Sequence, residues 1–181
     1  MVPVQEAMPG LVAEVTSDGG PAALLDGARR EAMARAGHLL ATRPRSESEL
    51  RSRLSDAGFE PSIVAAAVDR LRSLGLVDDA DFALQWVQER SARKKLSSRA
   101  LLHELLGKGI DREVAEAALA GAGLDEVAQA TDLASRYVRR VASKPLREQA
   151  TRIQQMLARR GYAHEVCEAA VKAVLPPEGW D

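Results

Sequence analysis

The stretch LLHELLGKGIDREVAEAAL at residues 101–119 contains the pattern that decides the fold. Leu101 and Leu105 lie four residues apart, so they share one face of a helix. Gly109 suits the end of that helix, because glycine adopts the left-handed conformation at little cost. An apolar residue follows the glycine, and Val114 then begins the buried stripe of another helix. The stretch therefore predicts two short helices joined by a tight turn.

This pattern occurs three times along the chain. Gly58, Gly109 and Gly161 are 51 and 52 residues apart, and each has apolar residues eight and four positions before it and five positions after it. No sustained alternation typical of a strand occurs. A further helix is expected before each pair, at about residues 28–41, 78–91 and 125–142. The sequence thus predicts an all-α fold of three tandem three-helix repeats.

The predicted repeats are short, so we expect neighbouring units to share faces and to form an elongated, curved helical body. The first 27 residues contain four acidic residues and no Lys or Arg, which is typical of a disordered segment. The predicted organisation is a disordered acidic leader at 1–27, repeats at 28–77, 78–123 and 124–175, and a C-terminal tail at 176–181.

Composition narrows the class of protein further. The 181 residues are 46% apolar but only 3% aromatic, and the formal net charge is −1. No stretch approaches the ~20 apolar residues of a membrane-spanning helix, so we expect no membrane association. With a single cysteine and no secretory signal pattern, a cytoplasmic protein is the simplest interpretation.

Motifs for catalysis, metals and cofactors are weak. The three histidines fall on different predicted helices at unrelated repeat positions, and no HExxH or CxxC pair exists. His164 and Cys167 could supply only half a metal site, and Cys167 fits a structural position better. The glycines at 107–109 end a helix and follow no strand, so they do not form a phosphate loop. We expect no enzyme activity, no metal and no cofactor.

Positive charge is concentrated in two segments. Residues 90–108 have a net charge of +5, with Glu104 as the only acid, and residues 136–160 have a net charge of +7. For any single residue a solvated helix surface is the simpler explanation, but the clusters favour a polyanionic or acidic partner. The candidate partner-binding residues are Arg90, Arg93, Lys94, Lys95, Arg99, Lys108, Arg136, Arg139 and Arg140.

An independent DNA-binding helical protein is the alternative, because three-helix units with tight turns occur in helix-turn-helix proteins. A recognition helix needs exposed basic or amide side chains. The third helices of the second and third units instead carry mainly acidic exposed residues, at 111–119 and 163–171. This argues against sequence-specific reading of DNA.

A family resemblance covers residues 28–175 and is most specific between 76 and 110. It is carried by an acidic segment, two aromatic residues, basic residues and a Lys-Gly-Ile turn: Asp78-Asp79-Ala80-Asp81-Phe82-Ala83, Trp86-Val87, Arg90, Lys94-Lys95, Leu101, Glu104-Leu105 and Lys108-Gly109-Ile110. This series resembles the signature of RecX proteins, which modulate the RecA recombinase.

The resemblance implies a non-enzymatic regulator of homologous recombination, DNA repair and the SOS response. Such a protein would dock in the groove of a RecA filament on single-stranded DNA, with at most weak direct contact to DNA. It would inhibit or modulate the recombinase, ATPase and co-protease activities of RecA. For Asp78 or Asp79 we expect an N-cap role, and for Phe82 and Trp86 a packing role.

Overall fold

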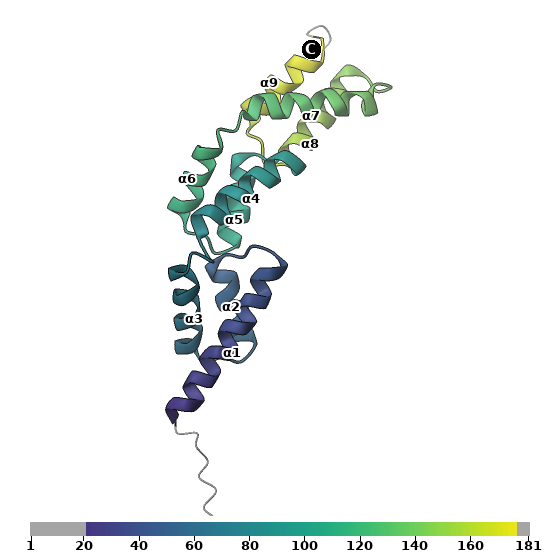
Figure 1. The fold of residues 1–181 in the computed structure, drawn as a ribbon. Helices are drawn as coiled ribbons and strands as arrows, with labels where there is room; N and C mark the ends of the chain where they lie inside the picture. Colours follow the sequence, from purple (N-terminus) through teal and green to yellow (C-terminus); the bar gives the residue numbers. More distant parts are fainter. Residues whose placement is uncertain (1–20, 177–181) are drawn as a thin grey trace, which may run out of the picture.

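The computed structural model describes residues 21–176, which form nine helices and no strand. The helices are α1 (Pro21–Thr42), α2 (Glu47–Asp56), α3 (Pro61–Ser73), α4 (Asp79–Lys94), α5 (Ser98–Gly107), α6 (Arg112–Ala122), α7 (Glu126–Val141), α8 (Leu146–Ala158) and α9 (His164–Val174). They group into unit one (α1–α3), unit two (α4–α6) and unit three (α7–α9), which confirms the predicted fold class (Figure 1).

The predicted glycine turns are confirmed at the ends of α2, α5 and α8. Gly58, Gly109 and Gly161 have φ angles of +88°, +74° and +89°. At the end of α5, the N–H of Ile110 donates to the carbonyl of Leu105 at 3.1 Å. The residue after each of the other two glycines makes the same bond, so the three turns are Schellman motifs.

Local polar groups begin the helices where the sequence predicts them. The hydroxyl of Ser46 accepts a hydrogen bond from the N–H of Glu49 at the start of α2. Asp78 accepts from two N–H groups at the start of α4, and Asp111 accepts from one at the start of α6. These bonds satisfy N–H groups that have no partner within the helix.

The first helix is longer than predicted. We expected the acidic leader to extend to residue 27, but α1 begins at Pro21. Proline fits the first turn of a helix, and the following residues, Ala22 to Leu25, are strong helix formers. Residues 23–26 of this added segment are exposed, so propensity rather than packing accounts for it. The remaining leader, residues 1–20, lies outside the described residues, as does the end of the tail, 177–181.

The hydrophobic core is divided into three separate clusters, one for each unit. Leu54 and Val68 belong to the first cluster, Leu105 to the second, and Leu157 and Val171 to the third. We expected neighbouring units to share faces, and the faces at which they meet are not apolar. The apolar stripes of each unit face one another inside that unit, and the units meet through helix ends carrying serine, glycine and charged residues.

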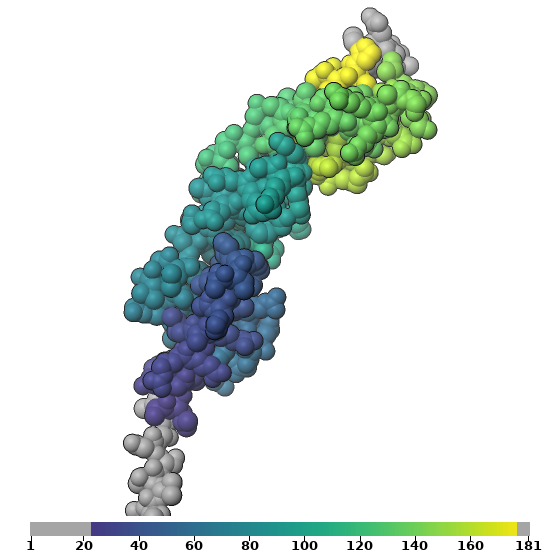
Figure 2. All heavy atoms as spheres, turned by 45° about the vertical axis from the view of Figure 1, so that its right-hand side comes forward, coloured from purple at the N-terminus to yellow at the C-terminus, as the bar shows by residue number. Residues whose placement is uncertain are grey.

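The three units follow one another in an elongated, curved body, as predicted (Figures 1 and 2). The start of α1 lies at one end of this body and α9 at the other. Helices α3 and α6 lie along one side, and the loops after α4 and α7 extend toward the opposite side.

Candidate functional site

The predicted site residues differ in how much of each side chain is exposed. Most are exposed at helix ends, whereas Lys95 is half-buried and both Arg90 and Lys108 are largely covered. The exposed members are Arg93, Lys94, Arg99, Arg136, Arg139 and Arg140.

The loop between α4 and α5 holds the first group of exposed cations. Lys94 ends α4, and Lys95 adopts the left-handed conformation, with φ at +52°. Arg93 pairs with Glu89 at 3.0 Å, but its side chain is 78% exposed, so this contact is weak. Lys94 and Arg99 make no ion pair within the part of the chain that the structure describes. Their charge is available to a partner.

Arg90 and Lys108 belong to an internal network around Trp86. The Arg90 guanidinium lies 4.2 Å from the centre of the Trp86 ring and 3.2 Å from Glu104. The Lys108 ammonium lies 4.1 Å from the same ring centre and 2.8 Å from Glu49 of unit one. The indole N–H of Trp86 donates to Glu104 at 2.9 Å. These two cations therefore stabilise unit two and its junction with unit one.

Glu49 is the acidic centre of that junction. Burial tends to raise the pKa of its carboxyl, but hydrogen bonds from Arg43 and Lys108 outweigh burial and lower the pKa to about 2. Glu49 stays charged at neutral pH and neutralises both cations. The structure thus assigns Lys108 a contact within the chain that sequence spacing did not reveal.

The second group of cations lies at the end of α7. Arg136 pairs with Asp132 on the same helix at 3.0 Å and is 74% exposed. Arg139 and Arg140 lie in the last turn, exposed and without an ion pair among residues 21–176. Cations at this position interact favourably with the helix dipole, which helps to hold them there.

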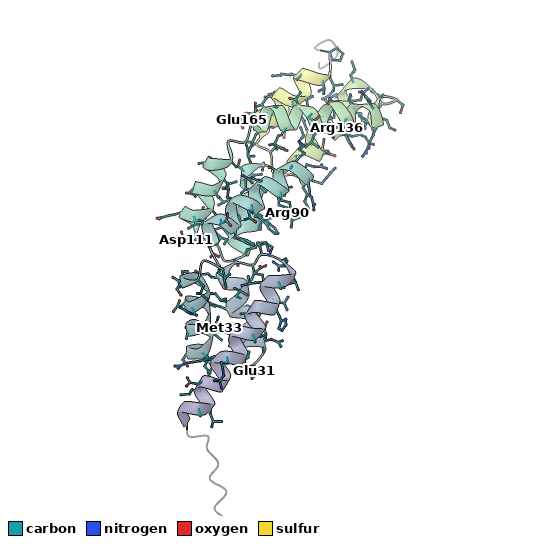
Figure 3. All side chains as sticks on the ribbon, viewed as in Figure 1. Glu31, Met33, Arg90, Asp111, Arg136 and Glu165 are labelled. Carbon is teal, nitrogen blue, oxygen red and sulfur yellow. The ribbon has the colours of Figure 1, made fainter. Side chains whose placement is uncertain are left out.

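Units two and three meet where the loop after α4 contacts the turn after α8. The N–H of Ser97 donates to the carbonyl of Arg160 at 3.1 Å, and the hydroxyl of Tyr162 donates to the carbonyl of Lys95 at 3.0 Å. Figure 3 shows Arg90 and Arg136 on one side of the body, and Asp111 on the opposite side. We call the side of Lys94, Lys95, Arg99, Arg136, Arg139 and Arg140 the basic side.

Sequence reasoning missed a third group of cations in unit one. Arg43, Arg45 and Arg53 line a cavity of about 480 Å³ together with Lys108. Arg43 precedes Lys94 by 51 residues, which is the repeat spacing. Comparing the loops in repeat register could have found this group, whereas counting net charge along the chain did not.

The cysteine and the potential metal-binding residues form no further site in the described part of the chain. Cys167 is buried, and burial raises the pKa of its thiol, which fits the structural role predicted for it. Within residues 21–176 no group of three His, Cys, Asp or Glu residues is arranged to hold a metal ion. None of the helices in this range is long and apolar enough to cross a membrane.

The fold and the basic side define a class of protein: an all-α chain of three tandem three-helix units with cationic loops along one side. Three family models match it in order, described as the first, second and third three-helix domains of RecX, at residues 32–71, 78–119 and 125–171. The chain belongs to the RecX family.

Individual relatives agree with this assignment. The chain is 39% identical to the "Regulatory protein RecX" of Mycobacterium avium (strain 104) over 142 residues, covering 77% of this chain and 82% of that protein. It is 38% identical over 172 residues to the protein of the same name from Mycobacterium sp. (strain KMS), covering 90% and 92%. The crystal structure of RecX from Lactobacillus salivarius shares the fold, with a TM-score of 0.76 and 20% identity over 82% of this chain and 97% of that one.

Proposed function

We propose that this chain binds the RecA filament on single-stranded DNA and lowers the recombinase, ATPase and co-protease activities of RecA, without catalysing a reaction itself. The observation that carries the proposal is membership of the RecX family, whose relatives are named regulatory proteins. On this proposal the chain acts in the cytoplasm, in homologous recombination, DNA repair and the SOS response.

The shape of the molecule supports a filament as the partner. A filament presents the same acidic protein surfaces and phosphates at regular intervals, and an elongated body can contact several of them at once. The basic side carries cations at two separate loops, after α4 and after α7. Several weak contacts made together give strong binding through effective concentration.

Within the predicted site, the structure favours different roles for different residues. Lys94, Arg99, Arg139 and Arg140 are exposed and carry no ion pair in the described residues, so we assign them to partner contact. Arg93 and Arg136 are exposed but paired, and they join this surface at small cost because exposed pairs are weak. Arg90 and Lys108 pack on Trp86 within unit two, and Lys108 also joins unit two to unit one.

The deciding experiment measures ATP hydrolysis by RecA on single-stranded DNA with stoichiometric amounts of this chain, and co-sedimentation of the chain with the filament. We expect a lower rate of hydrolysis and recovery of the chain in the pellet. An unchanged rate without co-sedimentation would exclude the proposal. Salt-sensitive binding to DNA alone, with RecA unaffected, would favour the independent DNA-binding protein.

A further inference from the structure

Units two and three have equivalent positions that carry different side chains. Helices α4 and α7 have the same length and begin after Asp78 and Asp125, while Gly109 and Gly161 end α5 and α8. Aligning the units on these residues pairs six positions around one place on the basic side. Trp86, Glu89, Arg90, Arg93, Glu104 and Lys108 correspond to Leu133, Arg136, Tyr137, Arg140, Met156 and Arg160.

In unit two, side chains of the protein itself fill the space between these six positions. The Trp86 ring lies between the cations of Arg90 and Lys108, at 4.2 and 4.1 Å from the ring centre. Glu104 accepts from Trp86 and pairs with Arg90, and Glu89 pairs with Arg93. The site thus contains a flat aromatic ring, and each cation in it has an anionic partner.

In unit three the counterparts of Trp86 and Glu104 are neither aromatic nor acidic. Leu133 replaces the tryptophan and Met156 replaces Glu104, and the six equivalent residues line an open pocket of about 340 Å³. Three arginines line it and none of the six lining residues is acidic. Asp132, outside the lining, pairs with Arg136, but Arg140 and Arg160 make no ion pair in the described part of the chain. The pocket therefore lacks a ring at the position equivalent to Trp86 and an acidic residue in its lining.

We propose that this pocket binds one nucleotide of single-stranded DNA, whose base and phosphate supply the missing ring and the missing anion. The base packs against Tyr137, Leu133 and Met156, and the phosphate lies among the three lining arginines, Arg136, Arg140 and Arg160. The volume is at the lower end of the ~300–1,000 Å³ range of small-molecule pockets, which suits a single nucleotide. The inference rests on the proposed function, because the DNA of the filament is the source of this ligand.

The chemistry of the lining residues also predicts which ligands the pocket distinguishes. A tyrosine face and guanidinium groups accept any base, so binding depends on the presence of a base but little on its identity. An acidic peptide would need two side chains to supply a ring and a carboxylate in the same arrangement. A nucleotide joins both in one rigid unit, which is why we choose it over an acidic protein segment.

The test uses the full chain without RecA. Binding of a fluorescent oligothymidylate is measured by anisotropy over a range of salt concentrations, beside an abasic oligonucleotide of the same length. Tyr137→Leu keeps the apolar packing and removes the ring, and Tyr137→Phe restores it. Arg136→Gln has a matched control in Arg112→Gln, since both arginines are exposed and pair with an acid four residues away, and Arg112 lies in α6, outside the pocket.

We expect Tyr137→Leu to weaken binding of oligothymidylate about tenfold and to leave abasic binding unchanged, with Tyr137→Phe close to the parent. Arg136→Gln should weaken binding and reduce the slope of log affinity against log salt by about one, whereas Arg112→Gln should not. Should Tyr137→Leu fail to fold in a circular dichroism melt, the parent's preference for intact over abasic DNA decides the question.

Two results would overturn the inference. One is equal affinity of the parent for intact and abasic DNA. The other is displacement of the oligonucleotide by polyglutamate at equal charge concentration, which would identify the pocket as a site for acidic protein. The RecA ATPase assay tests the proposed function independently of this DNA-binding test. A parent chain that binds DNA through this pocket but leaves RecA unaffected would refute the proposed function and not the nucleotide site.

Discussion

Lys108 is the residue at which units one and two meet. Its ammonium pairs with Glu49 and lies over Trp86, and its carbonyl accepts a hydrogen bond from the hydroxyl of Ser46 at 2.7 Å. Only 17% of its side chain is exposed. Partly covered pairs of this kind are screened less by salt than surface pairs, so this junction contributes to stability as well as to geometry.

Glu49→Gln tests that contribution. The pKa of Glu49 is about 2, below its ordinary value of 4.5, so the charged form stabilises the folded chain above pH 4.5. This stabilisation is lost as the pH falls from about 4.5 to 2. At pH 7 we expect the variant to be less stable by roughly 1–3 kcal/mol, because Lys108 and Arg43 lose a charged acceptor. Urea unfolding at pH 7 and pH 3 measures the difference in stability between parent and variant, and a difference that is equally large at both pH values would contradict this account.

Gly109→Ala tests the fit between the two units. A Cβ atom at residue 109 would overlap the side chain of Ser48, whereas one at Gly58 would meet nothing within 4 Å. Both positions are left-handed, so both substitutions cost about 1–2 kcal/mol for conformation. Gly109→Ala should cost about 1–3 kcal/mol more than Gly58→Ala because of crowding. Equal losses of unfolding free energy in the two variants, measured with denaturant, would show that the junction accommodates the added methyl group without destabilisation.

At the scale of helices, one joint is repeated between the units. The N–H of Glu47 donates to the carboxylate of Asp79 at 2.8 Å, and the N–H of Ser98 donates to the carboxylate of Glu126 at 2.6 Å. In each case the first residue of a second helix is held by the first residue of the next unit. The anionic side chain also neutralises the positive end of the helix dipole.

Sequence predicts the helices well and the joints poorly. Helix ends are set by local groups such as Asp78 and Gly109, which act within a few residues of themselves. The joints combine groups about 30 to 60 residues apart, such as Glu47 with Asp79 and Ser46 with Lys108. Nothing in a short window indicates these contacts. For the same reason Lys108 was predicted to be a free cation.

Separate cores predict that the units unfold with some independence. Leu54 is fully buried in unit one, and Leu105 occupies the equivalent place in unit two. Leu54→Ala should destabilise unit one by about 2–5 kcal/mol. Hydrogen exchange should then accelerate in α2 and α3 while α5 and α8 stay protected. Leu105→Ala should give the reverse pattern, and uniform loss of protection in either variant would show that the joints couple all three units.

For the whole molecule, the sequence predicted the elongated body but not the distribution of its free charge. Ion pairs with Glu89, Glu104, Glu49 and Asp132 neutralise part of each basic cluster. What remains on the basic side is a smaller set of cations at helix ends. Net charge along a segment therefore overestimates the charge that a partner meets.

Reversal of charge at two pairs of exposed cations separates partner binding from folding. Lys94→Glu/Arg99→Glu changes the basic side at the end of α4 and the start of α5. Arg112→Glu/Lys172→Glu changes the start of α6 and the last turn of α9. Both double variants alter the net charge by the same amount, and each places one new acid at a helix start and one at a helix end, so their effects on the helix dipoles match.

We expect both double variants to melt close to the parent, because these side chains are exposed. The first should need about tenfold more protein to inhibit the RecA ATPase, since attraction to acidic groups becomes repulsion. The second should inhibit like the parent. Inhibition by the parent should also weaken as salt rises from 50 to ~200 mM, and this dependence should be smaller for the first variant. A folded first variant that inhibits like the parent at every salt concentration would show that Lys94 and Arg99 are a solvated surface and that RecA is bound elsewhere on the molecule.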